Sequence, residues 1–207
     1  MTAPGAAAVA RFQGRRPVGS TAVALAVVSL TLLPTRARAQ CPASTDANHV
    51  QTDGPPPPAA PDVINRDDAG RATVRASRVA EPIAIDGLLD EAFYRATSSI
   101  PDLIQSVPDV GARPTETTEA WVGFDAENIY VAARLWESAP EIDWVANEMR
   151  RDGPMIKLND NFGVFLDTYC DRRNAVGFYV TPVGGFTDLQ MINEGNPNFD
   201  WNPVWEV

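Results

Sequence analysis

Apolar and polar side chains alternate along several short stretches in the second half of this chain. The alternation runs through residues 120–125, 129–136, 162–167 and 176–181. A period of two puts successive side chains on opposite faces of a strand, so each stretch predicts a strand with one buried face. Turns rich in acidic residues, Gly and Asn separate these stretches. The pattern predicts an all-β fold, a two-sheet β-sandwich of the jelly-roll type.

Other elements are predicted on either side of this region. Residues 73–79 favour a first strand, and Ile83 and Ile85 favour a second short one. Residues 88–96 have helical spacing, which predicts one short helix. Residues 201–207 begin a further strand, and the chain stops within it. Because a sandwich rarely leaves such an edge unpaired, we expect the domain at 72–207 to be incomplete and the natural protein to continue beyond Val207.

The first 39 residues have the features of a secretory signal peptide. Arginines at 11, 15 and 16 precede an apolar run at 21–33, and Ala-Arg-Ala at 37–39 offers a small-x-small cleavage site. The apolar run is shorter than the roughly 20 residues that span a bilayer. We therefore expect residues 1–39 to lie outside the fold and the mature chain to be exported, to the periplasm, the outer membrane or the medium.

Residues 40–71 are polar and rich in proline, with four prolines in a row at 55–58. Such a run favours extended polyproline II, and the segment has few large apolar residues, so we predict a disordered linker. The two cysteines, Cys41 and Cys170, lie on either side of much of the domain. Export permits a disulfide between them, and two unpaired cysteines remain the alternative.

Charge and histidine content exclude several functions. The chain carries 17 basic and 27 acidic residues, and without residues 1–39 the balance falls from −10 to −15. A surface this acidic repels nucleic acid and anionic lipid. The one histidine, His49, lies in the linker, so the domain contains no Ser-His-Asp triad and no histidine zinc site. No carboxylate pair stands out as a glycosidase pair, which leaves enzymatic activity open.

The order of short motifs from residue 83 onward is more specific than any one of them. They are IAIDGLLDE at 83–91, WVGFD at 121–125, IYV at 129–131, RRD at 150–152, DNFGVFLDT at 160–168 and the tryptophans at 201 and 205. Together they resemble the family 9 carbohydrate-binding modules, in particular the copy at the N-terminus of bacterial outer-membrane-barrel proteins of a domain-of-unknown-function group. The resemblance covers nearly all of residues 75–207.

This resemblance implies a two-sheet sandwich in which aromatic rings grip a glycan and bound calcium supports the fold. It also implies an association with glycoside hydrolysis and carbohydrate catabolism, carried by a partner domain. That partner, a barrel or a glycosidase, would follow Val207. The alternative is a structural periplasmic or surface domain of a barrel protein, without affinity for sugars.

Sugar rings are bound by aromatic planes together with groups that hydrogen-bond hydroxyls. The candidate carbohydrate-binding residues on this basis are Trp201, Trp121, Arg150, Arg151 and Asn198. Trp201 lies in a polar loop, and Trp121 lies on the less apolar face of its predicted strand. Core packing is the alternative for each tryptophan, and an ion pair with Asp160 or Asp167 is the alternative for the two arginines.

Carboxylates near turns are the candidate calcium ligands. Asp160, Asp167 and Asp188 are the three we select, because calcium prefers oxygen ligands that converge from loops. No EF-hand spacing is present. The alternative is that these aspartates close turns through hydrogen bonds to nearby backbone groups.

Overall fold

The computed structural model describes residues 7–13 and 54–207, apart from 102, 170 and 172. Within these residues the fold is all-β with one short helix, as the alternation predicts. The strands are β1 Ala7–Gln13, β2 Ile64–Arg66, β3 Ala72–Val74, β4 Ser77–Arg78, β5 Thr118–Phe124, β6 Asn128–Leu135, β7 Phe162–Leu166, β8 Ala175–Val180, β9 Phe186–Met191 and β10 Trp205–Glu206. The helix α1 is Ala92–Ala96, and short 3-10 turns occupy Glu141–Asp143 and Ile156–Leu158.

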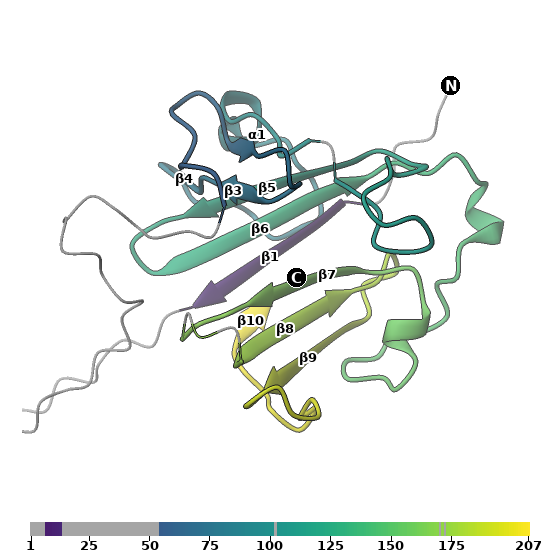
Figure 1. Cartoon of the computed structure of the whole chain (residues 1–207). Helices are drawn as coiled ribbons and strands as arrows, with labels where there is room; N and C mark the ends of the chain where they lie inside the picture. Colours follow the sequence, from purple (N-terminus) through teal and green to yellow (C-terminus); the bar gives the residue numbers. More distant parts are fainter. Residues whose placement is uncertain (1–6, 14–53, 102, 170, 172) are drawn as a thin grey trace, which may run out of the picture.

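The strands form two main sheets and one small one (Figure 1). The larger sheet has the order β10-β1-β6-β5-β4, and the second has the order β7-β8-β9. Strands β2 and β3 form a separate pair. Among the described strands most neighbours are antiparallel, and only β4 runs parallel to its partner β5. Gly184, with φ of 80°, lies in the turn of the β8–β9 hairpin, where a left-handed conformation favours glycine.

Aromatic side chains fill the space between the two main sheets. Phe12 of β1 lies 4.3 Å from Phe178 of β8 and stacks on Trp205 of β10, measured between ring centroids. Phe178 and Trp205 meet edge to face at 4.9 Å. Both of these residues are buried, and together with Ala10 and Val180 they form one core cluster. The two sheets therefore pack face to face, as in a sandwich.

The other face of the larger sheet is also covered. Helix α1 and the segment before it lie over β5 and β6, where Tyr94 packs edge to face against Trp121. Val9 of β1 and Tyr130 of β6 belong to the same buried cluster. Both faces of the larger sheet therefore carry buried apolar side chains.

Strand β1 lies in a segment that we expect to be outside the fold. Ala7–Gln13 pairs with β6 along its whole length and with β10 at Arg11 and Phe12 (Figure 1). Val9 is 2% exposed, and Arg11 forms an ion pair with Glu206. The physical reason is that the alternation places Val9 in the cluster beneath α1, and Ala10 and Phe12 in the cluster between the two main sheets. The remaining residues of the proposed signal peptide, including 21–33 and 37–39, lie outside the described residues.

Part of the proposed linker is also folded. Residues 54–71 include β2, and Val63 just before it is 5% exposed in a cluster with Ile100 and Ala120. Thr73 donates a hydrogen bond to the Pro55 carbonyl at 2.6 Å, which ties the proline run to β3. The boundary of the folded part therefore lies well before residue 72. Residues 40–53, with Cys41 and His49, lie outside the described residues, as does Cys170.

Helical structure is less extensive than the sequence pattern predicts. The helix spans five residues and begins at Ala92 rather than at Leu88. The segment around Ile83 is not a strand, although Ile83 is buried at 3% exposure beneath the helix. In the part of the chain that the structure describes, no helix is both long enough and apolar enough to cross a membrane.

Asp125 holds the turn between β5 and β6. Its carboxylate accepts hydrogen bonds from the backbone N–H groups of Glu127 and Asn128, both at 2.7 Å, and from the Tyr130 hydroxyl at 2.7 Å. Hydrogen bonds from the Asn128 side chain, the Glu127 N–H and Tyr130 hold the pKa of Asp125 well below its usual range. The ionised carboxylate thus stabilises the folded state more than the unfolded one.

We expect this stabilisation to disappear in acid. Because the pKa of Asp125 is lowered by folding, its contribution is complete above the unfolded value of about 3.9 and is lost as the pH falls toward the folded value. Urea unfolding of the wild type and of Asp125→Ala should therefore differ most at neutral pH and converge in acid. The exposed Glu81→Gln is the control, and a constant difference at every pH would contradict the assignment.

Candidate functional site

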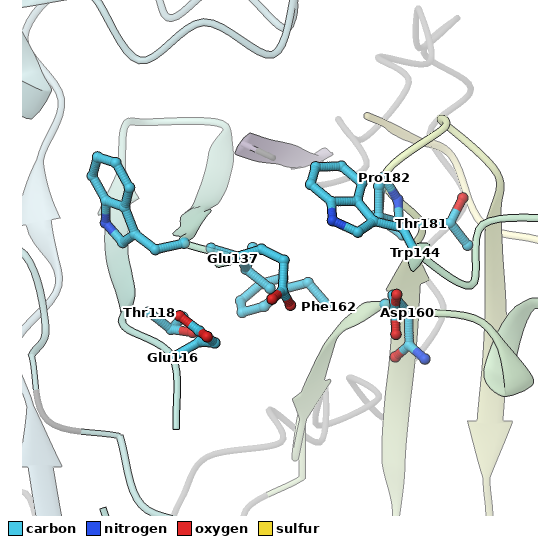
Figure 2. A pocket seen from close by; sticks show the side chains of 12 residues that line it. Glu116, Thr118, Glu137, Trp144, Asp160, Phe162, Thr181 and Pro182 are labelled. Carbon is cyan, nitrogen blue, oxygen red and sulfur yellow. The ribbon is translucent and has the colours of Figure 1, made fainter. Parts of the chain in front are cut away.

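A cavity of about 240 Å³ opens between the two main sheets, at one of their ends. Its wall combines two tryptophans, one phenylalanine, three carboxylates and several neutral polar groups. The lining residues are Glu116, Thr118, Leu135, Trp136, Glu137, Trp144, Asp160, Asn161, Phe162, Val180, Thr181 and Pro182. Figure 2 shows Glu116 and Thr118 on one side of the cavity and Trp144 and Thr181 on the other. Glu137 and Phe162 lie between these two groups. This volume is somewhat smaller than the roughly 300 Å³ at which small-molecule sites usually begin.

Strand register brings these residues to the same place. Thr118 and Leu135 are partners at one end of the β5–β6 pair. Phe162 and Val180 are partners at one end of the β7–β8 pair. One end of a pair of antiparallel strands from each sheet therefore lies at the cavity. Beyond the ladder, the Trp136 N–H donates to the Thr117 carbonyl at 2.9 Å, which fixes the backbone of this tryptophan.

Trp144 reaches the cavity from the connection between β6 and β7. Its indole N–H donates to the Ala139 carbonyl at 3.3 Å. The next residue, Val145, exchanges two hydrogen bonds with Asp160: its N–H donates to Oδ2 at 2.9 Å, and its carbonyl accepts from the Asp160 N–H at 2.8 Å. These bonds fasten the loop to the start of β7, so the half-buried indole is held in position at the rim.

Three carboxylates line the cavity without a basic partner. Glu116 accepts a hydrogen bond from the Ser138 hydroxyl, and Glu137 accepts one from the Ala139 N–H at 2.8 Å. Asp160 accepts the bond from Val145 described above. Among the described residues, none of the three forms an ion pair, and the lining contains no Lys, Arg or His. The cavity is therefore anionic as well as aromatic.

Trp121 does not face solvent, so its assignment to a binding surface is wrong. The indole is 5% exposed, lies edge to face with Tyr94 at 5.6 Å, and donates to the Thr97 carbonyl at 3.1 Å. The guanidinium of Arg134 lies 5.7 Å from the ring centroid. Helix α1 and the segment before it cover this face of the sheet. The face that the alternation predicts to be exposed is therefore buried.

Arg151 forms a structural network with Asp188 instead of lining the cavity. Its guanidinium donates to Asp188 Oδ2 at 2.9 Å and to the side chain of Asn202, and it lies over the Phe186 ring at 5.2 Å. Trp205 donates to the same Asp188 oxygen at 3.0 Å. Burial raises the pKa of Asp188, which is 1% exposed, and the bonds from Trp205 and Arg151 offset part of that rise.

Arg150 also has a local partner. It forms two side-chain hydrogen bonds to Glu148, both at 3.0 Å, and this carboxylate is itself buried. Both arginines therefore form ion pairs, as the alternative to sugar binding predicts. Their partners are Glu148, Asp152 and Asp188 rather than Asp160 or Asp167.

The remaining carbohydrate candidates are Trp201 and Asn198, which lie beside the second sheet. Trp201 is half-buried and packs against Phe178, with ring centroids 6.0 Å apart. Asn198 pairs with Gln190 through backbone hydrogen bonds, and its side chain accepts the N–H of Asp200. Neither residue lines the cavity. The structure therefore does not bring the five sequence candidates together.

The three proposed calcium ligands occupy different surroundings. Asp160 lies at the cavity rim, Asp167 accepts backbone N–H groups in the turn after β7, and Asp188 is paired with Arg151. Across residues 7–13 and 54–207, where described, no group of three or more His, Cys, Asp or Glu side chains is arranged to hold a metal ion. Calcium binding stays a prediction, without an assembled site at these three residues.

Comparison with known proteins adds no relative. No protein-family model, curated protein or solved structure matches this chain. The case for a function therefore rests on the cavity itself.

Proposed function

We propose that this protein binds carbohydrate, and that the cavity between the two sheets is the binding site. The observation that carries the proposal is the meeting of two indoles with several hydrogen-bonding side chains in one cavity. Sugar rings have apolar C–H faces and a rim of hydroxyls, and such a mixture of aromatic planes and oxygen acceptors is suited to both.

The anchoring of the site supports this proposal. Trp144 is held by its own indole hydrogen bond and by the Val145–Asp160 pairing, so little side-chain freedom remains to be lost on binding. Asn161 and Thr118 provide an amide and a hydroxyl group on the same wall. In this proposal, the cavity of about 240 Å³ holds one sugar unit at the end or edge of a longer glycan.

The biological setting is part of the same proposal. The features of residues 1–39 are typical of an exported chain, and the motif order from residue 83 resembles family 9 carbohydrate-binding modules. A module of this kind would serve glycan capture and carbohydrate catabolism, with O-glycosyl hydrolysis carried out by a partner domain. The described residues themselves supply no assigned catalytic pair.

A second candidate is a structural domain of a surface protein without sugar affinity. One observation favours it: Trp121, Arg151 and Asp188, three residues selected for ligand or metal binding, serve internal packing. Under this alternative the cavity would have no glycan ligand, and the domain would act through its surface alone.

Titration of the full chain with neutral oligosaccharides separates the two. We expect saturable quenching of tryptophan fluorescence by cello- or xylo-oligosaccharides, and a loss of affinity of about tenfold or more in Trp144→Ala, because stacking and the cavity wall are removed together. Trp201→Ala is the matched control and should bind normally. Normal binding by Trp144→Ala, or no binding of any sugar by the folded protein, would reject the proposed site.

A further inference from the structure

We infer that the cavity selects cationic amino sugars, such as oligomers of glucosamine, over neutral sugars of the same shape. This inference rests on the proposed function, and it names the chemical class of glycan. It follows from the charge of the wall rather than from its aromatic content, since aromatic planes alone accept neutral and charged sugars alike.

The wall carries three carboxylates and no compensating base. Glu116, Glu137 and Asp160 each direct one oxygen to a hydroxyl or backbone N–H of the surrounding loops. The other oxygen of each has no hydrogen-bonding partner among the described residues, so each carboxylate retains an acceptor for a ligand. A protonated amine donates to such an acceptor more strongly than a hydroxyl does, because the hydrogen bond is charge-assisted.

Four basic side chains on neighbouring elements are engaged with other groups. Arg134, on the strand that leads to the cavity, faces Glu119 and the ring of Trp121. Lys157 lies over the ring of Phe199 at 4.2 Å. Arg150 and Arg151 are bound to Glu148 and Asp188. A ligand that brings its own positive charge therefore meets an uncompensated site.

The aromatic wall adds to the same preference. Trp136 and Trp144 line the cavity with the carboxylates. An indole face attracts a cation through its quadrupole, and this attraction is absent for a hydroxyl. An amino sugar thus combines an apolar ring face for the indoles with an ammonium group for the carboxylates. An N-acetylated sugar keeps the ring but loses the charge, so we expect it to behave as a neutral ligand.

Two trisaccharides that differ at one position provide the test. Glucosamine trimer and cellotriose share the β-1,4-linked ring frame and differ in the amine or hydroxyl at carbon 2. Calorimetry on the full chain should give a dissociation constant at least about tenfold lower for the amino sugar, as charge-assisted hydrogen bonding and a buried cation would give. The advantage should shrink at high salt and fall to about twofold or less in Glu137→Gln.

Glu141→Gln is the control, because Glu141 is exposed and lies near the cavity without lining it. Since the whole chain is acidic, an equal loss in this control would show general attraction to the surface and would overturn the inference. Equal affinity for the two trisaccharides would overturn it too, while leaving the proposed function intact. Failure of both trisaccharides and of other neutral oligosaccharides to bind would reject the proposed function as well.

Discussion

A chain that begins at Gln40, the predicted mature end, should fail to show the cooperative unfolding of the full chain. This chain lacks β1, which lies between β6 and β10 in the larger sheet. Its loss removes the seven-residue pairing with β6 and separates β10 from the rest of the sheet. No other change that we consider affects so much of the core.

The expected size follows from the side chains of β1. Full burial of a valine such as Val9 contributes about 1.5–3 kcal/mol, and Phe12 adds its contacts with Phe178 and Trp205. The loss of these two buried side chains, together with the hydrogen bonds between β1 and β6, approaches the total stability of an ordinary domain, which is about 5–15 kcal/mol. Thermal unfolding by circular dichroism would measure the effect.

A peptide added in trans provides the control. A synthetic peptide of residues 7–13 should restore cooperative unfolding to the shortened chain, and the same peptide with Val9→Asp should not. An unchanged melting temperature in the shortened chain without peptide would contradict the placement of β1. Cleavage after Ala39 would remove β1, which contributes to two of the core clusters, so the same experiment also tests export with cleavage at this position.

The second large effect is expected at Trp121. Its replacement by alanine should lower the free energy of unfolding by about 3–5 kcal/mol, the range measured for large aromatic residues in protein cores. The indole is 5% exposed and contacts Tyr94, and its N–H holds the Thr97 carbonyl at the end of α1. The substitution therefore loosens the helix from the sheet. Urea unfolding measures the loss.

Trp144→Ala is the matched comparison for this prediction. Trp144 is half-buried at the cavity, so its removal should affect stability clearly less and sugar binding clearly more. Trp121→Ala, where it remains folded, should keep its sugar affinity. A Trp121→Ala protein of normal stability that no longer binds sugar would contradict the roles assigned to both tryptophans.

Four of the strands are predictable from the alternation, whereas the faces that they bury are not. The alternation identifies β5, β6, β7 and β8 to within about two residues. It wrongly assigns Trp121 to the outside, because it assumes one solvated face for each strand. Helix α1 and the second sheet cover both faces of the larger sheet, and no local pattern in β5 reveals a cover contributed by residues so far away in sequence.

The cavity is also beyond local sequence reasoning. Trp136 and Trp144 are recognisable as two of the five tryptophans, but nothing in their spacing indicates that they line one cavity. Their meeting depends on the register of two hairpins in different sheets. One signal was available: Trp136 directly follows a strand and Trp144 lies in the connection to the next one, and such loops often form sites.

The most direct test of carbohydrate binding at this cavity is nuclear magnetic resonance of the tryptophan indoles. The chain has five tryptophans, so the indole N–H groups give five separable signals. On addition of a bound oligosaccharide, we predict that the signals of Trp136 and Trp144 shift and that those of Trp121 and Trp205 stay in place. Shifts confined to Trp201, or no shift with any glycan, would contradict the account.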